Sequence, residues 1–302
     1  MSYVDVFKVP HFYTLTANAA NMSKTLVFVH GWLLSQRYWQ PVVEYLNHDF
    51  RCLSYDLRGF GASNAHLHQR DYRATLGRPT SAYSLEAYAQ DLGMLIKSLD
   101  LSNVWLVGHS LGGSVALWAA NLFSPQVAGI ICVNAGGGVY LPNEFRRFRQ
   151  AGQQIVRWRP AWLAYLPLTA YAFTRLMVFR PLSLRWGKQR VSDLLAAHEE
   201  AAMGALLEST TETEVHRLPQ VVASLKQPTY FIAGEKDSVM QEKYVRHLAS
   251  FHPLFESDGS NVAVLAECGH MAMLEQPIAL AQTIQAIVQS GSFPDQRFLK
   301  SA

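Results

Sequence analysis

The sequence has few cysteines, no long apolar run and no leader-like start. Its three cysteines are an odd and widely spaced set (Cys52, Cys132 and Cys268), which argues against a disulfide framework. No stretch reaches the roughly 18–20 apolar residues of a membrane span. The opening MSYVDVFKVP has neither a basic start nor an apolar core, so we expect no signal peptide. We therefore predict a reduced, globular, cytoplasmic protein.

The sequence also lacks the spacing of a metal site. His66 and His68 form an H-x-H pair, but no cluster of cysteines or acids accompanies them, so we interpret both as loop residues. The run Gly136–Gly138 is not followed by Lys-Ser or Lys-Thr, so it is interpreted as a joint in the chain and not as a phosphate loop. No nucleic-acid-binding motif is present. We expect no metal, no cofactor and no nucleic-acid partner.

Positive charge is concentrated in one segment. The net charge of the chain is +3, yet residues 144–190 hold ten Arg or Lys, nine aromatic residues and one acid, Glu144. Two interpretations stay open. The segment could contact an anionic membrane peripherally, with arginines toward the headgroups and aromatic residues at the interface. Alternatively, the acids of residues 191–218 could neutralise it internally, with the aromatic residues as a local core.

Short apolar runs alternate with helical patterns along most of the chain. Because such strands are buried on both faces, we predict an α/β fold with a mostly parallel central sheet and helices on both faces. The alternation stops after the strand that ends near Asn134, and a helical block follows. We divide the chain into a core (1–137), a helical cap or lid (138–218) and the rest of the core (219–302). The strand-bearing runs are 25–32, 50–63, 103–110, 127–135, 228–237 and 261–270.

A G-x-S-x-G motif lies between an apolar strand and a helical segment. The motif runs Gly108-His109-Ser110-Leu111-Gly112. Glycines suit the tight turn because a Cβ there would clash with neighbouring backbone. The turn lifts the Ser110 hydroxyl to a helix N-terminus, where partial positive charge favours an oxyanion. We interpret this segment as a nucleophile elbow with Ser110 as the nucleophile.

A serine nucleophile needs a base, and the base needs an acid to orient it. His270 follows the last predicted strand and Asp237 follows the one before it. Open sheets bind ligands at the carboxyl ends of their strands, where all three residues fall. We therefore predict Ser110, Asp237 and His270 as the catalytic residues.

An oxyanion hole needs two backbone N–H donors. We assign these to Leu111 and, in the His30-Gly31-Trp32 loop, to Trp32. For the substrate pocket we predict Trp32, His109, Trp158 and Trp162, although simple packing under the cap is an equal alternative for the Trp32 side chain.

Several motifs, in order, resemble the α/β-hydrolase superfamily: HGW, DLRGFGAS, GHSLGG, GEKD and GHMAMLEQP. The resemblance implies that fold, the Ser…Asp…His chain order and a turn at 56–63 that shapes the site wall. Some relatives carry the acid after the strand that ends here at Asn134, which cannot serve. A weaker similarity, through NAGGGVYL and EFRRFRQAGQQ, is to chlorophyll-dephytylase-like esterases of cyanobacteria and plastids. It implies a bulky membrane-borne ester, such as a phytyl or lipid ester.

The leading hypothesis is a serine hydrolase that cleaves a carboxylic ester of a hydrophobic, membrane-associated substrate through an acyl-enzyme. One alternative is a cofactor-free oxygenase or a lyase on the same scaffold, in which the histidine acts on the substrate itself. Another is a non-catalytic binding protein that retains the fold, against which the complete set of three residues argues.

Overall fold

The computed structural model describes residues 2–16, 23–64, 81–137, 142–256 and 259–293. Within them, one eight-stranded sheet has the order β1-β2-β4-β3-β5-β6-β7-β8. The six predicted strands are confirmed: β3 (Thr25–Val29), β4 (Arg51–Tyr55), β5 (Val104–His109), β6 (Val127–Val133), β7 (Thr229–Gly234) and β8 (Val262–Leu265). These six pair in parallel, as expected.

Two strands were not predicted. β1 (Ser2–Val6) and β2 (Val9–Leu15) form an antiparallel hairpin, and β2 then pairs antiparallel with β4. The two-residue turn uses Phe7 and Lys8, both at positive φ. Such turns usually carry Asn-Gly or Asp-Gly, so the sequence offered no hairpin signal there.

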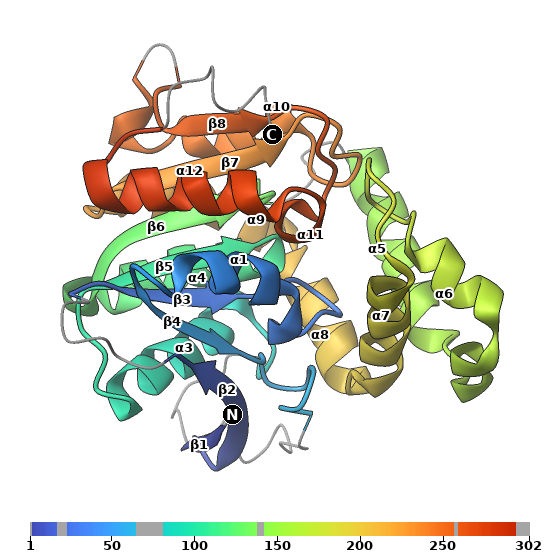
Figure 1. The fold of residues 1–302 in the computed structure, drawn as a ribbon. Helices are drawn as coiled ribbons and strands as arrows, with labels where there is room; N and C mark the ends of the chain where they lie inside the picture. Colours follow the sequence, from blue (N-terminus) through green and yellow to red (C-terminus); the bar gives the residue numbers. More distant parts are fainter. Residues whose placement is uncertain (1, 17–22, 65–80, 138–141, 257–258, 294–302) are drawn as a thin grey trace.

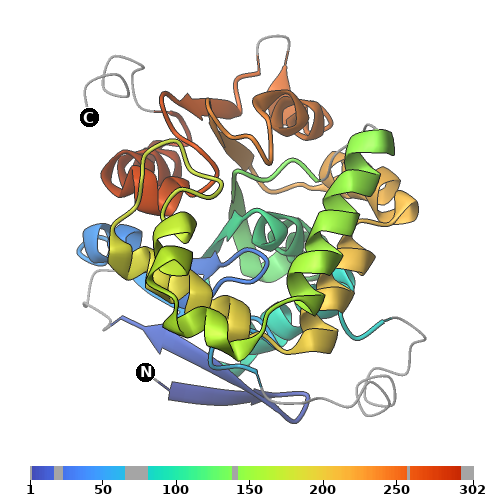
Figure 2. The same ribbon diagram turned by 90° about the vertical axis from the view of Figure 1, so that its right-hand side faces the viewer.

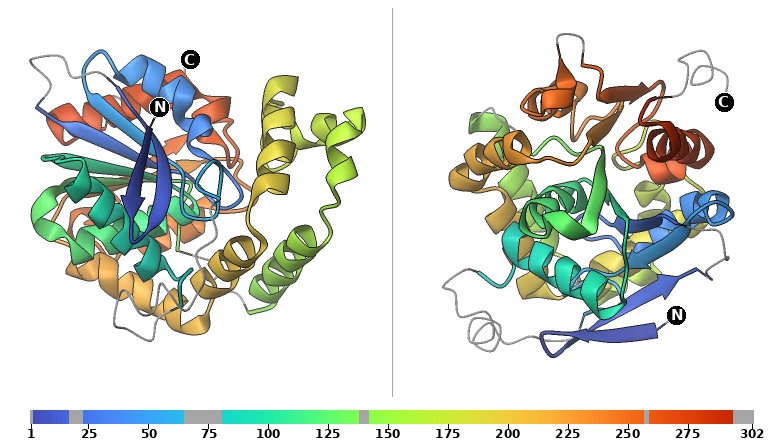
Figure 3. Two further views of the ribbon diagram at one scale, coloured as in Figure 1. Left: turned by 90° about the horizontal axis from the view of Figure 1, so that it is seen from below. Right: turned by 90° about the vertical axis from the view of Figure 1, so that its left-hand side faces the viewer.

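The parallel strands are buried on both faces because alternate side chains point to opposite sides. In β3, Val27 and Val29 join one core, and Leu26 and Phe28 join the other. The first core is covered by α3 (Leu85–Ser98), α4 (Leu111–Leu122), α9 (Glu212–Ser224) and α10 (Glu242–Ala249). The second is covered by η1 (Gln36–Trp39), α1 (Gln40–Leu46), α11 (Ala272–Glu275) and α12 (Pro277–Ser290), as the right-hand view of Figure 3 shows.

A helical lobe stands beyond the carboxyl ends of the strands (Figures 1 and 2). It contains α5 (Pro142–Arg157), η3 (Ala161–Tyr165), α6 (Pro167–Phe173), α7 (Leu184–Ala196) and α8 (Glu199–Ser209). The next helix is α9 (Glu212–Ser224), which packs on α4 of the core. The predicted end of the cap, residue 218, falls inside this helix. Of the predicted joint at Gly136–Gly138, only Gly138 lies outside the described residues, as does the pair His66 and His68.

Arginines bind the carboxyl ends of neighbouring helices within this lobe. Arg149 Nη1 donates to the carbonyl oxygens of Leu207 (3.0 Å) and Thr210 at the end of α8. Arg159 Nη1 donates to the Leu194 and Ala197 oxygens at the end of α7, at 2.6 Å each. The last carbonyls of a helix lack intrahelical donors and carry partial negative charge, so a guanidinium stabilises them. Part of the basic segment thus serves helix capping, a role that neither interpretation of its charge included.

Several hydrogen bonds connect the lobe to the core, and two of them are made by the side chains of Ser35 and Trp32. The Asp193 carboxylate on α7 accepts a hydrogen bond from Ser35 Oγ (3.0 Å), and the Trp32 indole donates to the Ala202 oxygen on α8 (2.8 Å). Both core residues belong to the loop after β3. The lobe is therefore held over that loop, beside the carboxyl ends of the central strands.

Candidate active site

The turn between β5 and α4 presents Ser110 in a strained conformation. Its φ of 51° lies in the left-handed region, which costs a residue with a Cβ on the order of 1–3 kcal/mol. Flanking glycines leave room for the turn. A Cβ on Gly108 would lie 2.2 Å from the Gly112 carbonyl oxygen, and one on Gly112 would lie 2.4 Å from the Val29 oxygen. These are the two glycines of the predicted elbow, and backbone crowding requires both.

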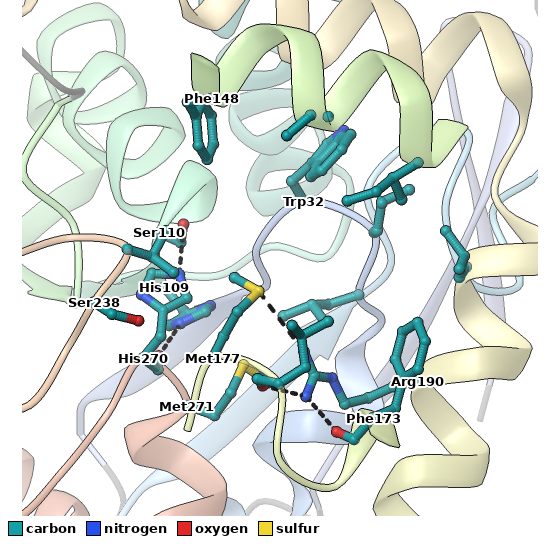
Figure 4. Close-up of a pocket in the computed structure, with 18 of the residues that line it drawn as sticks. Trp32, His109, Ser110, Phe148, Phe173, Met177, Arg190, Ser238, His270 and Met271 are labelled. Atoms are coloured by element: carbon teal, nitrogen blue, oxygen red, sulfur yellow. Dashed lines mark hydrogen bonds between the residues drawn. The ribbon is translucent and has the colours of Figure 1, made fainter. Parts of the chain in front are cut away.

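The structure brings the three predicted catalytic residues together. Ser110 Oγ lies 3.2 Å from His270 Nε2, and His270 Nδ1 lies 2.8 Å from Asp237 Oδ2. Because the carboxylate can only accept, Nδ1 carries the proton and Nε2 is left to accept from the serine hydroxyl. His270 and Asp237 are buried, whereas Ser110 is partly exposed to the cavity (Figure 4).

Asp237 is held as a charged acceptor. Burial by itself raises the pKa of its carboxyl, but His270 and two backbone amides outweigh burial, so that the pKa lies below its usual value. The amides are those of Val239 and Met240, which donate to Oδ1 at 2.8 and 2.9 Å. The carboxylate is thus suited to orient the imidazole and to stabilise it when it becomes charged.

Asn134 supports this acid, a role that the sequence did not reveal. Its side-chain amide donates to Asp237 Oδ2 (2.9 Å) and to the Gly269 oxygen (3.2 Å). Asn134 follows β6 at a φ of 49°, a conformation that Asn adopts more readily than most residues. An amide at the end of the neighbouring strand is the one signal that could have suggested this contact.

Two further histidines are buried and neutral beside the site. His109 Nε2 donates to the His270 carbonyl oxygen (2.8 Å), and its ring centroid lies 4.8 Å from that of His270. Burial lowers the pKa of His109 to about 3 and that of His30 to about 4. Neither histidine can act as a cation at neutral pH. His109 also lines the cavity, as predicted for the pocket.

His30 connects the loop after β3 to the turn at 56–63. Its Nδ1 donates to the Gly31 oxygen (2.8 Å), and its Nε2 accepts from the Leu57 amide (2.9 Å). Asp56 accepts from the backbone amide of Gln36 (2.6 Å), the first residue of η1, directly after the same loop. No residue of the turn is among those that line the cavity. The turn therefore shapes the site wall only indirectly, because its hydrogen bonds hold the loop after β3 that lines the cavity.

The two predicted oxyanion donors have backbone N–H groups without a partner among the described residues. Leu111 is the first residue of α4, where helix geometry leaves the amide free. Trp32 follows Gly31, whose Cβ would approach His109 Nδ1 to 2.7 Å, so the loop lies against the elbow. This arrangement is consistent with the assignment of both amides to an oxyanion hole, which stays a prediction.

Ser110 opens into a cavity of about 720 Å³ between lobe and core. The volume falls in the range of small-molecule sites, about 300–1,000 Å³. Figure 4 shows Trp32, Phe148 and Met177 around the space in front of Ser110. The lining is mostly apolar and comes largely from the loop after β3, α5, the segment from Phe173 to Met177, α7 and the loop after β7.

The predicted pocket residues have different outcomes. Trp32 lines the cavity with its ring and also packs under the lobe, so both readings of its side chain hold. Trp158 and Trp162 do not line it, and that prediction is wrong. They are 77% and 57% exposed, because Trp158 follows the last turn of α5 and Trp162 lies on η3 at the outer surface. Phe148, Phe173 and Met177 take their place.

Among the described residues, no group of three or more His, Cys, Asp or Glu is placed to hold a metal ion. No helix formed by these residues is both long enough and apolar enough to span a bilayer.

A parallel sheet with an exposed serine at a strand-to-helix elbow defines the class of α/β hydrolases. The protein-family model described as alpha/beta hydrolase fold matches residues 24–277, so the chain belongs to that family and is an enzyme of that fold. Among curated proteins, 2-succinyl-6-hydroxy-2,4-cyclohexadiene-1-carboxylate synthase of Salmonella paratyphi C is 28% identical over 270 residues. The match covers 88% of this chain and 94% of that one.

Solved structures with the same fold include two esterases. The thermophilic esterase of Thermogutta terrifontis is 21% identical with a TM-score of 0.69, and covers 93% of each chain. The esterase of Exiguobacterium antarcticum is 18% identical with a TM-score of 0.74, and covers 96% of this chain and 99% of its own. At these identities the likeness shows the fold alone.

Proposed function

We propose that this protein is a serine-dependent carboxylic ester hydrolase whose substrate carries a long apolar group. The observation that carries the proposal is the hydrogen-bonded series Ser110, His270 and Asp237, which ends at a mostly apolar cavity. The serine supplies a nucleophile, and the cavity provides room for an acyl or alcohol chain next to it.

The reaction has two halves. Ser110 Oγ attacks the ester carbonyl carbon while His270 Nε2 takes the hydroxyl proton, and Asp237 stabilises the imidazolium. The amides of Leu111 and Trp32 donate to the carbonyl oxygen as it becomes an anion. The tetrahedral intermediate collapses, the C–O bond to the alcohol breaks, and His270 returns the proton to the departing alcohol. Water, deprotonated by His270, then releases the acid from Ser110.

The substrate that we infer is a hydrophobic ester held in a membrane, such as a lipid or phytyl ester. The apolar lining supports a long hydrocarbon group because each buried methylene contributes about 0.8 kcal/mol. The basic and aromatic composition of residues 144–190 supports delivery from a lipid surface.

A second candidate is a lyase or synthase on the same scaffold, favoured by the curated relatives. Their name specifies a product with succinyl and carboxylate groups. Two cations, Arg147 and Arg190, do line the cavity here. Arg190 Nη1 is already bound to the Phe173 and Leu176 oxygens, at 2.6 and 2.7 Å. The remaining lining is mostly apolar, which supports an uncharged substrate over a dicarboxylate.

A paired-substrate assay tests the proposal. We expect cleavage of p-nitrophenyl butyrate and a rise in kcat/KM toward longer acyl chains, up to about 4-fold per methylene. Intact mass should show one acyl group on the protein, absent in Ser110→Ala. The p-nitrophenyl monoester of succinic acid, with the same number of acyl carbons, should react more slowly. A preference for the charged ester, or no acyl adduct, would favour the second candidate.

A further inference from the structure

Most of the large hydrophobic side chains that are exposed in the described part of the chain lie in the lobe. Of fourteen large hydrophobic side chains that are exposed among the described residues, ten lie between Ile155 and Leu184. Tyr165 and Leu168 reach 84% and 79% exposure on η3 and α6. Figure 2 looks onto this lobe. Concentration of exposed apolar groups in one region marks an interaction surface, whereas scattered ones need no explanation.

This surface is continuous with the mouth of the cavity. Ile155 and Leu176 both line the cavity and are 42% and 45% exposed, so they form its rim. Arg147, Ala151 and Ile155 are four residues apart on α5 and all line the cavity. Trp158, three residues further on, continues the same helical face onto the outer surface. An apolar chain that leaves the cavity at this rim therefore meets the exposed aromatic residues.

Exposed cations accompany the same surface. No Asp or Glu occurs between Glu144 and Asp193 in the sequence. Arg157 and Arg175 are exposed beside the aromatic residues, and Arg175 lies 4.2 Å from the Tyr171 ring centroid. On α7, Arg185 and Lys188 line a shallow second pocket. Exposed Trp and Tyr flanked by Arg and Lys are the composition of a bilayer interface.

We propose that this surface, defined by Ile155, Trp158, Trp162, Tyr165, Leu168 and Tyr171 and called the docking face, binds an anionic lipid bilayer with the cavity mouth toward the lipid. The purpose of docking rests on the proposed function: an ester moves from bilayer to Ser110 without crossing water. A second copy of the chain is a less suitable partner for the docking face than a bilayer. A two-fold interface would set the same cations against each other, without an acid from the segment to neutralise them.

Vesicle flotation tests the docking face. The wild-type protein should float with phosphatidylcholine vesicles that contain phosphatidylglycerol and bind pure phosphatidylcholine at least ~10-fold more weakly, because the cations contribute. The double variant Trp162→Ser/Leu168→Ser should bind the anionic vesicles at least ~10-fold more weakly, since apolar area is lost. Tyr3→Ser is the matched control: Tyr3 is 59% exposed on β1 at the sheet edge, and its removal should leave binding unchanged.

A charge variant separates the contribution of the cations to vesicle binding from the contribution of apolar area. Arg157→Gln/Arg175→Gln should weaken anionic binding and reduce its salt dependence, whereas Lys97→Gln/Lys226→Gln, exposed on the core, should do neither. Equal binding to both vesicle types, binding to neither, or full binding by Trp162→Ser/Leu168→Ser would overturn the proposal. So would a wild-type dimer that this variant converts to a monomer.

Failure of docking and failure of the proposed function give different results. If the chemistry is right and docking is wrong, a soluble p-nitrophenyl ester is cleaved in a Ser110-dependent way, but vesicle binding is absent. If docking is right and the chemistry is wrong, vesicle binding persists in wild type and in Ser110→Ala, but neither cleaves the ester. The variants of the docking face should retain cleavage of the soluble ester, because none of the substituted residues lines the cavity.

Discussion

Asn134 Nδ2 lies 2.9 Å from Asp237 Oδ2, the same oxygen that accepts the hydrogen bond of His270 Nδ1 at 2.8 Å. One carboxylate oxygen, on the loop after β7, thus accepts an amide N–H from the residue after β6 and an imidazole N–H from the loop after β8. A carboxylate with hydrogen-bond donors on both oxygens is fixed in rotation and in charge.

From this contact we predict that the catalytic acid can be transferred from Asp237, after β7, to position 134, after β6. Asp237→Asn should lower kcat about 10³–10⁴-fold, because an amide at this position favours the wrong imidazole tautomer. The double variant Asn134→Asp/Asp237→Asn should recover at least ~10-fold over Asp237→Asn, since Asp also tolerates the positive φ of residue 134. Steady-state hydrolysis of p-nitrophenyl butyrate measures both. Full activity of Asp237→Asn would place the acid elsewhere.

Removal of the nucleophile or base should abolish turnover. We expect Ser110→Ala and His270→Ala to lose at least ~10³-fold in kcat without a comparable change in KM, because both act in the chemical step. Ser238→Ala is the matched control: Ser238 also lines the cavity but has no assigned role, so its activity should stay within ~3-fold of wild type. Equal losses in all three variants would indicate damage to the cavity and not to the chemistry.

Acid should destabilise the fold through its buried histidines. Folded-state pKa values of about 4 for His30 and about 3 for His109 lie below the unfolded value near 6.5. The unfolded state therefore binds more protons between pH 6.5 and 4. The stabilisation that the two neutral histidines contribute is fully present above pH 6.5. It is lost as pH falls, by about 1.4 kcal/mol per pH unit for each histidine.

Urea unfolding of wild type and His30→Gln at several pH values measures this dependence. The variant should be less stable at pH 7, because it loses a ring that accepts from Leu57 and donates to Gly31. Its slope of unfolding free energy against pH should be flatter by about 1.4 kcal/mol per unit over this window. Parallel slopes for the two proteins would show that His30 does not contribute to the acid response.

The loss of stability on replacing an arginine of α5 should depend on the contacts of its side chain and not on its charge. Arg149→Met should lower the unfolding free energy by about 1–2 kcal/mol, because the α8 carbonyls lose a charged donor. Arg157→Met, at an exposed position of the same helix, should change it by less than ~0.5 kcal/mol. Chemical denaturation of both variants is the measurement. Equal effects would mean that capping by Arg149 is not energetically important.

Sequence alone was sufficient wherever the signal was local. The elbow at Ser110 could be predicted because a tight strand-to-helix turn needs glycines within two residues on each side. Apolar runs marked the six parallel strands because both of their faces are buried. Since parallel strands end at one edge of the sheet, the positions after β5, β7 and β8 had to come together, and Asp237 and His270 could be assigned before any geometry was known.

Only the tertiary structure decided what depends on packing between distant segments. Arg149 and Thr210 are 61 residues apart, and nothing near Arg149 in the sequence indicates that it caps α8. Trp158 and Trp162 share the aromatic character of Phe148 and Phe173, but the packing of α5 and α6 sets which of these face the cavity. Composition determines that such side chains seek an apolar or interfacial environment, and the orientation of each helix determines which one they meet.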